Sequence, residues 1–121
     1  MSSKPEEMRS RTKAFALRII RLFRSLPYRT DTQVLGKQLL RCGTAVAANY
    51  RAACRARSKI EFVARISIVA EEADECVLWL ELLIESGILK TEMTVDLLKE
   101  AKELAAILTA SRETAKTKKA A

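Results

Sequence analysis

The fold is decided by SKIEFVARISIVAEEADECVLWLELLIESG, residues 58–87. Ser58 is followed three residues later by Glu61, which is the spacing of a capping box at the start of a helix. Apolar residues then recur every three or four positions as far as Ile84, the period of one face of an α-helix. Gly87 supplies the left-handed residue that commonly ends a helix. The stretch therefore predicts one long amphipathic helix between Ser58 and Gly87.

Two helices are predicted before this one, from the same period and from the residues that begin or end them. The first is expected over about residues 5–25, because Pro27 follows and the residue before a proline is disfavoured in the α region. The second is expected to start near Thr30, since Thr30 and Gln33 have the spacing of another capping box.

A fourth helix is expected from about residue 92 to Arg112. The tail at 114–121 is expected to be basic and frayed, because it has no large apolar side chain. The chain has 121 residues, which fits a single domain over 1–121. Short links force neighbouring helices to run antiparallel, which predicts an all-α, up-down-up-down four-helix bundle. The alternative is that the second and third helices form one long kinked helix, since the link at Arg57 and Ser58 is so tight.

Charge is distributed unevenly along the chain, whose net charge is +7. Residues 1–60 hold 14 Lys and Arg against 3 Asp and Glu, a net charge of +11, whereas residues 61–121 hold 8 against 12, a net charge of −4. This asymmetry predicts one basic side of the folded protein, of the kind that binds nucleic acid. The alternative is that the charges are solvated or pair with the acidic half of a neighbouring subunit.

Eight basic residues on the first two predicted helices are the candidates for binding nucleic acid: Arg11, Arg18, Arg21, Arg24, Lys37, Arg41, Arg51 and Arg55. Their position suits contact with phosphates. Aromatic residues make up only 5% of the chain, so a platform on which bases stack is not expected. Binding would then depend on the RNA or DNA backbone and weaken steeply with salt.

Some apolar residues lie outside the core stripes. Leu17 and Ile20 lie among the basic residues of the first helix, whereas Leu78 and Leu82 lie on the acidic outer face of the third. Two such sites predict self-association. The basic first helix against the acidic third helix of a neighbour is a head-to-tail contact, and such contacts close into rings. In the alternative function, an assembly or adaptor protein, the charges serve only subunit and protein–protein contacts.

A polar network is predicted between the second and third helices. Asn49 falls on a core stripe, where a buried amide must be hydrogen-bonded. Arg65 and Glu72 share one edge of the third helix, and Glu75 lies close by. We expect these side chains to form a network that fixes the register of the helices. An active site built on Arg65 and Glu72 is the weaker alternative.

Most catalytic chemistry lacks its usual residues here. The chain contains no His, the commonest metal ligand and general base, and no Gly-rich phosphate loop. Cys42, Cys54 and Cys76 are far apart in sequence and are expected to be free, buried side chains. We therefore expect a non-enzymatic protein without catalytic residues, cofactor or metal. No apolar run is long enough to cross a bilayer and no secretory signal is evident, so a cytoplasmic location without a membrane partner is expected.

Several segments together resemble a known family, the four-helix-bundle proteins encoded in intervening sequences of bacterial 23S ribosomal RNA genes. The resemblance extends from Phe15 to Leu108 and is strongest over 38–84. The segments that carry it are QLLRCGTAVAANYR at 38–51, SKIEF at 58–62, IVAEEADE at 68–75, and Trp79-Leu80.

The resemblance implies a bacterial four-helix bundle that assembles into a ring, typically a pentamer. It also implies a relationship to the accessory subunit of diversity-generating retroelements, which resembles a basic barrel that binds nucleic acid and a reverse transcriptase. Most members of the family have no assigned function. One departure is Ala52, which stands after Asn49-Tyr50-Arg51 where the family commonly has Glu. A site built on that Glu is not expected here.

Overall fold

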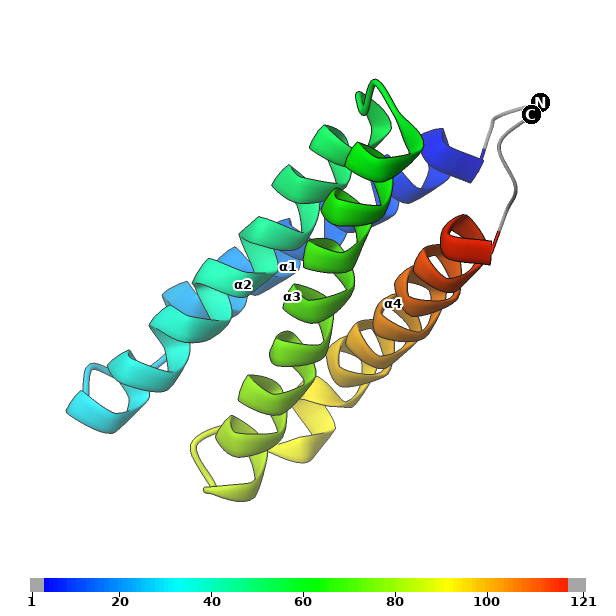
Figure 1. Ribbon diagram of the computed structural model, residues 1–121. Coiled ribbons are helices and arrows are strands. Elements are labelled where there is room, and N and C mark those ends of the chain that lie inside the picture. Colours follow the sequence, from blue (N-terminus) through cyan, green and yellow to red (C-terminus); the bar gives the residue numbers. More distant parts are fainter. Residues whose placement is uncertain (1–3, 118–121) are drawn as a thin grey trace.

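The computed structural model describes residues 4–117, and these form four helices joined by short links. The helices are α1 (Lys4–Ser25), α2 (Thr30–Cys54), α3 (Lys59–Glu85) and α4 (Thr91–Thr117). They lie side by side and alternate in direction (Figure 1), so the predicted antiparallel bundle is confirmed. The chain reverses between α2 and α3, which excludes the single kinked helix.

The two ends of α3 follow the sequence signals. The Ser58 hydroxyl accepts a hydrogen bond from the backbone N–H of Glu61 at 3.0 Å. The Glu61 carboxylate reaches back to the N–H of Arg57 at 3.2 Å, one residue earlier than in the usual capping box. At the other end Gly87 has φ +85°, the left-handed conformation that glycine adopts without steric cost. The predicted start and stop of this helix are thus confirmed.

The capping box predicted at Thr30 and Gln33 is wrong. Arg29 is the residue before the helix, with φ −131° and ψ 152°, and it makes no side-chain cap hydrogen bond. Its carbonyl accepts the N–H of Gln33 at 2.8 Å, so Thr30 is already the first helical residue. In this first turn a hydrogen bond from a backbone N–H to a side chain is made by the next residue: Asp31 Oδ1 accepts the N–H of Thr32 at 2.7 Å.

The last helix is longer than predicted. α4 continues past Arg112 to Thr117, whose hydroxyl donates to the carbonyl of Glu113 at 3.2 Å. Residues 114–117, expected to belong to a frayed tail, are therefore helical. The rest of that tail, 118–121, lies outside the described residues.

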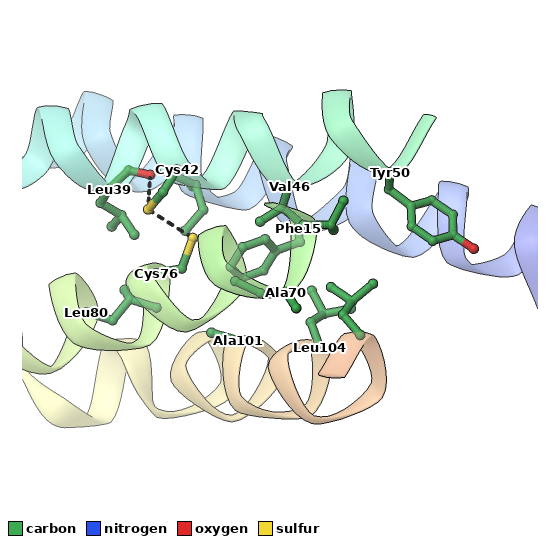
Figure 2. Packing of buried hydrophobic residues seen from close by; sticks show 14 of the residues in the cluster. Phe15, Leu39, Cys42, Val46, Tyr50, Ala70, Cys76, Leu80, Ala101 and Leu104 are labelled. Atoms are coloured by element: carbon green, nitrogen blue, oxygen red, sulfur yellow. Dashed lines mark hydrogen bonds between the residues drawn. The ribbon is translucent and has the colours of Figure 1, made fainter. Parts of the chain in front are cut away.

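The core is one continuous cluster to which all four helices contribute. Figure 2 shows part of it, with Phe15 of α1 packed between the other helices and Leu104 of α4 facing α3. α2 and α3 pack most extensively, followed by α3 and α4, while α1 and α4 share the smallest contact. Fully buried members include Phe15, Ile19, Leu39, Val46, Ile66, Val69, Leu80, Leu83, Leu104 and Leu108.

Two of the cysteines face each other in this core, on α2 and α3 (Figure 2). Cys42 and Cys76 are both fully buried, and their Sγ atoms are 3.1 Å apart. The pKa of the Cys76 thiol is raised, first because its S–H donates to the Cys42 sulfur and second because burial disfavours the thiolate. All three cysteines are free, as predicted, and Cys54 is only half-buried.

Candidate nucleic-acid interface

Most of the exposed basic residues between 4 and 117 lie on α1, on α2 and in the links that follow these two helices. Between Met8 and Ile60 the chain contains a single acidic residue, Asp31, so neither helix carries carboxylates except near its start. Six of the eight predicted candidates are exposed, and none forms an ion pair with any residue between 4 and 117. These six are Arg18, Arg21, Arg24, Lys37, Arg51 and Arg55.

Arg11, one of the eight predicted candidates, is ion-paired in the structure. Its guanidinium donates two hydrogen bonds to the Glu100 carboxylate, at 2.7 and 2.8 Å, and a third to Glu103 at 3.0 Å. The Arg11 hydrogen bond lowers the pKa of Glu100, and burial of that carboxylate opposes the shift. Arg11 lies on the flank of α1 that faces α4. Its guanidinium therefore pairs across the contact between α1 and α4, the smallest helix contact of the bundle, and does not face outward.

Arg41 is likewise neutralised within the molecule. It reaches from α2 to α3 and contacts both Glu72, at 3.0 Å, and Glu75, at 2.8 Å. The pKa of Arg41 is raised, first by the hydrogen bond to Glu72. Arg41 and Arg11 are therefore removed from the set of free cations, and both stabilise contacts between helices.

The predicted network of Asn49, Arg65, Glu72 and Glu75 is not brought together. The Asn49 amide donates to the carbonyl of Ala45 at 3.0 Å, so it is satisfied within its own helix. Arg65 is exposed and forms no ion pair within the described chain. Seven residues along a helix correspond to roughly 10 Å of rise, which separates Arg65 from Glu72. Glu72 and Glu75 instead contact Arg41 across the α2–α3 contact.

An open groove of about 550 Å³ runs between α1 and α2 within the basic surface. Its floor is small and apolar, formed by Ala16, Leu17, Ile20, Ala47 and Ala48. The basic residues at its rim are Arg9, Lys13 and Arg51. We call this surface, the groove with its rim together with Arg21, Arg24, Lys37 and Arg55, the basic α1–α2 face. Arg18 lies outside it, because it is two turns from Arg11 on the flank of α1 that faces α4.

Arg9 and Lys13 were missed when the candidates were chosen from the sequence. They are spaced by one helical turn, and continuing that spacing leads to Leu17 and then to Arg21 and Arg24. This periodicity is the signal that places Arg9 and Lys13 on the same side of α1 as Arg21 and Arg24.

The four predicted oligomer contacts lie on two separate surfaces. Leu17 is 42% exposed and lines the α1–α2 groove with the half-buried Ile20. On α3, Leu78 is 46% exposed and Leu82 is 39% exposed. The helical period places exposed carboxylates beside the α3 leucines: Glu71, Asp74 and Glu85. We call this second surface the acidic α3 stripe.

Between residues 4 and 117 no three His, Cys, Asp or Glu side chains are grouped closely enough to hold a metal ion. In the same part of the chain no helix combines the length and the hydropathy that crossing a bilayer requires.

The model of the 23S rRNA-intervening sequence protein family matches residues 6–110. The chain belongs to this family. A similar solved structure is a protein of unknown function from the S23 ribosomal protein family of Bacteroides thetaiotaomicron. It is 31% identical, with a TM-score of 0.84, and the match covers 93% of this chain and all of that one. No curated protein matches.

The family assignment agrees with the resemblance that the segments over 38–84 carry. The comparisons do not point to a catalytic family. The match ends at residue 110, so it includes nearly all of the four-helix core and the whole of the basic α1–α2 face.

Proposed function

We propose that this family member is a non-enzymatic, homo-oligomeric accessory protein that binds nucleic acid through its basic α1–α2 face. The observation that carries the proposal is the separation of two kinds of cation. Arg11 and Arg41 are neutralised at helix contacts, whereas six other candidates stay exposed and unpaired on helices almost without carboxylates. An unneutralised basic surface of this kind attracts polyanions.

The contact would be with phosphates and would not depend on sequence. Arginine donates paired hydrogen bonds to phosphate oxygens, and five of the six free cations are arginines. Each neutralised phosphate releases condensed counterions, so affinity falls as the salt concentration rises. With about six such contacts, affinity is expected to drop about a thousandfold between low and moderate salt.

The test measures binding of a generic RNA and of a DNA duplex at low and moderate salt, together with the mass by light scattering. The variant Arg24→Glu/Arg51→Glu reverses two charges on the basic α1–α2 face. The control Lys99→Glu/Lys102→Glu makes the same change in net charge on exposed positions of α4. The proposal requires the first variant to lose affinity and salt dependence and the control to retain most of both. Equal losses would point to net charge alone and contradict a defined face.

Assembly or adaptor function is the second candidate, and a separate observation favours it. The groove has an apolar floor, which phosphate contact does not need, and its rim is basic. The acidic α3 stripe offers the complementary surface, with Leu78 and Leu82 among carboxylates. Docking that stripe into the groove of the next copy is a head-to-tail contact that closes into a ring. The resemblance implies a pentamer for such a ring and a partner protein such as a reverse transcriptase.

Nucleic-acid binding, measured beside the oligomer mass in a variant that cannot assemble, separates the two candidates. Leu78→Asp places a charge on the acidic α3 stripe and is expected to reduce the mass to that of a monomer. Val95→Asp is the control, because Val95 is 51% exposed on α4, a helix that contributes to neither surface. An oligomer that depends on Leu78 but ignores nucleic acid at every salt concentration would favour assembly. Binding that persists after loss of the oligomer would favour the basic α1–α2 face as a nucleic-acid site in its own right.

A further inference from the structure

Tyr28 is the most exposed large apolar side chain of the described residues, with 94% of its surface open to solvent. It lies in the link between α1 and α2, at one end of the basic α1–α2 face. The link itself is fixed. Leu26 is buried and its N–H donates to the carbonyl of Phe23 at 3.2 Å, while the N–H of Arg29 donates to the carbonyl of Pro27 at 3.1 Å. The ring is thus held outward by an ordered turn.

Basic residues are close to Tyr28 in the sequence. Arg24 lies in the last turn of α1, Arg29 follows Tyr28 directly, and Lys37 lies about two turns into α2. All three are exposed. Asp31 accepts the N–H of Thr32 at 2.7 Å and forms an exposed ion pair with Arg29 at 3.6 Å, so Arg24 and Lys37 are the two cations here without an ion pair in the described chain.

An exposed aromatic ring among cations has one use that fits the proposed function. Arginines and lysines can hold the phosphates of a strand, while an aromatic ring stacks on a base that has left its partner. A ring that is 94% exposed contributes nothing to the core, and both of its faces are open for such a contact.

We propose that Tyr28 stacks on an unpaired base at the end of a duplex whose backbone lies along the basic α1–α2 face. This inference rests on the proposed function and narrows its ligand to a nucleic acid with a duplex and a single-stranded end. One ring is not a platform, so affinity still comes mainly from phosphates. Stacking of one base on an aromatic side chain corresponds to a preference of about five- to a hundredfold.

The experiment compares three RNA hairpins: one with blunt ends, one with a short unpaired overhang, and one whose overhang has the same phosphates but no bases. In the hairpin with the base-bearing overhang, the first unpaired base is 2-aminopurine, whose fluorescence falls when it stacks. The full chain is expected to bind the base-bearing overhang at least fivefold more tightly than the abasic one, with a loss of fluorescence. Tyr28→Ala should remove both the preference and the loss, and Tyr28→Phe should keep them.

The control variant is Ile60→Ala. Ile60 is 84% exposed and begins α3, at the opposite end of α2 from Tyr28, so the preference should not change. Tyr28→Ala should bind the blunt hairpin as the unmodified protein does. If Tyr28→Ala keeps the preference, the stacking inference is wrong while the basic α1–α2 face stands. If the protein shows no salt-dependent binding to any hairpin, the proposed function fails and this inference fails with it.

Discussion

Replacing Gly43 by Ala is expected to destabilise the protein, although Ala is the better helix former. Gly43 lies on α2 directly against the side chain of Ile19 of α1. A Cβ added there would lie 2.9 Å from Ile19 Cγ1, 3.0 Å from its Cγ2 and 3.2 Å from its Cβ. Ile19 is fully buried and β-branched, so these atoms are fixed close to its own backbone and cannot rotate away.

The magnitude follows from two opposing terms. Overpacking a well-filled core costs about 1–3 kcal/mol. Ala in place of Gly inside a helix gains about 1 kcal/mol. We therefore expect Gly43→Ala to lower the free energy of unfolding by about 1 kcal/mol, and by no more than about 2. Gly36→Ala is the comparison on the same helix, because its Cβ would lie 2.7 Å from the terminal Cδ1 methyl of Leu26 and 3.1 and 3.2 Å from two atoms of the Phe23 ring. The methyl can turn aside and the half-buried ring needs to shift only a few tenths of an ångström, so we expect Gly36→Ala to cost less than Gly43→Ala.

Urea unfolding followed by circular dichroism measures both variants at one fixed protein concentration, since oligomerisation would shift the apparent stability. A cycle with Ile19→Ala isolates the contact. Truncating Ile19 removes Cγ1 and Cγ2 and with them most of the overpacking term, so in that background Gly43→Ala should stabilise the protein by up to about 1 kcal/mol. If Gly43→Ala stabilises the native chain as a simple helix-propensity change would, the close approach of α1 and α2 at this position is refuted.

Three further predictions follow from particular contacts. Ser58→Ala should cost about 1 kcal/mol in urea unfolding because it removes a side-chain cap, whereas Thr30→Ala should cost less than about 0.5, since Thr30 caps nothing. The pKa of Glu100 is lowered in the folded state, so its contribution to stability is present above the unfolded pKa and is lost as pH falls through the folded one. Glu100→Gln should therefore be less stable at neutral pH and lose less stability on acidification; equal slopes in the two acid titrations would contradict the pairing. A thiol reagent should modify Cys54 first and reach the buried thiol pair only on unfolding, because the pair is enclosed and the pKa of Cys76 is raised; simultaneous modification of all three would contradict the packing.

The helices could be predicted because their signals are local. The start of α3 depends on Ser58 and Glu61, and its end depends on Gly87, all within a few residues of the boundary. The same local pattern failed at Thr30, because the extended conformation of Arg29 let its carbonyl accept the first helical hydrogen bond. The capping-box spacing shows only which residues are able to cap a helix. Where the helix begins also depends on the backbone conformation of the residue that precedes the motif, here Arg29.

The candidate site could be predicted only in outline, because charge alone does not say which flank of a helix meets a neighbour. Arg11 and Arg18 are two turns apart on the same flank of α1, the flank that faces α4. Arg11 pairs with Glu100, whereas Arg18 forms no ion pair and only lowers the pKa of that carboxylate through its charge. Which flank faces α4 depends on the order and hand in which four antiparallel helices pack. That arrangement is fixed by contacts between distant segments and is not encoded in the period of any one helix.

The distribution of paired and free cations supports one surface for function. Arg11 pairs across the α1–α4 contact and Arg41 across the α2–α3 contact, so these two neutralised arginines lie between helices. The contact between α1 and α2 needs no such pair, because Gly36 and Gly43 let the two helices approach through small and apolar side chains. Its outer surface is therefore free to carry cations without partners. A surface with unneutralised charge repels itself, and its cost is offset when a polyanion or the acidic α3 stripe of another copy covers it.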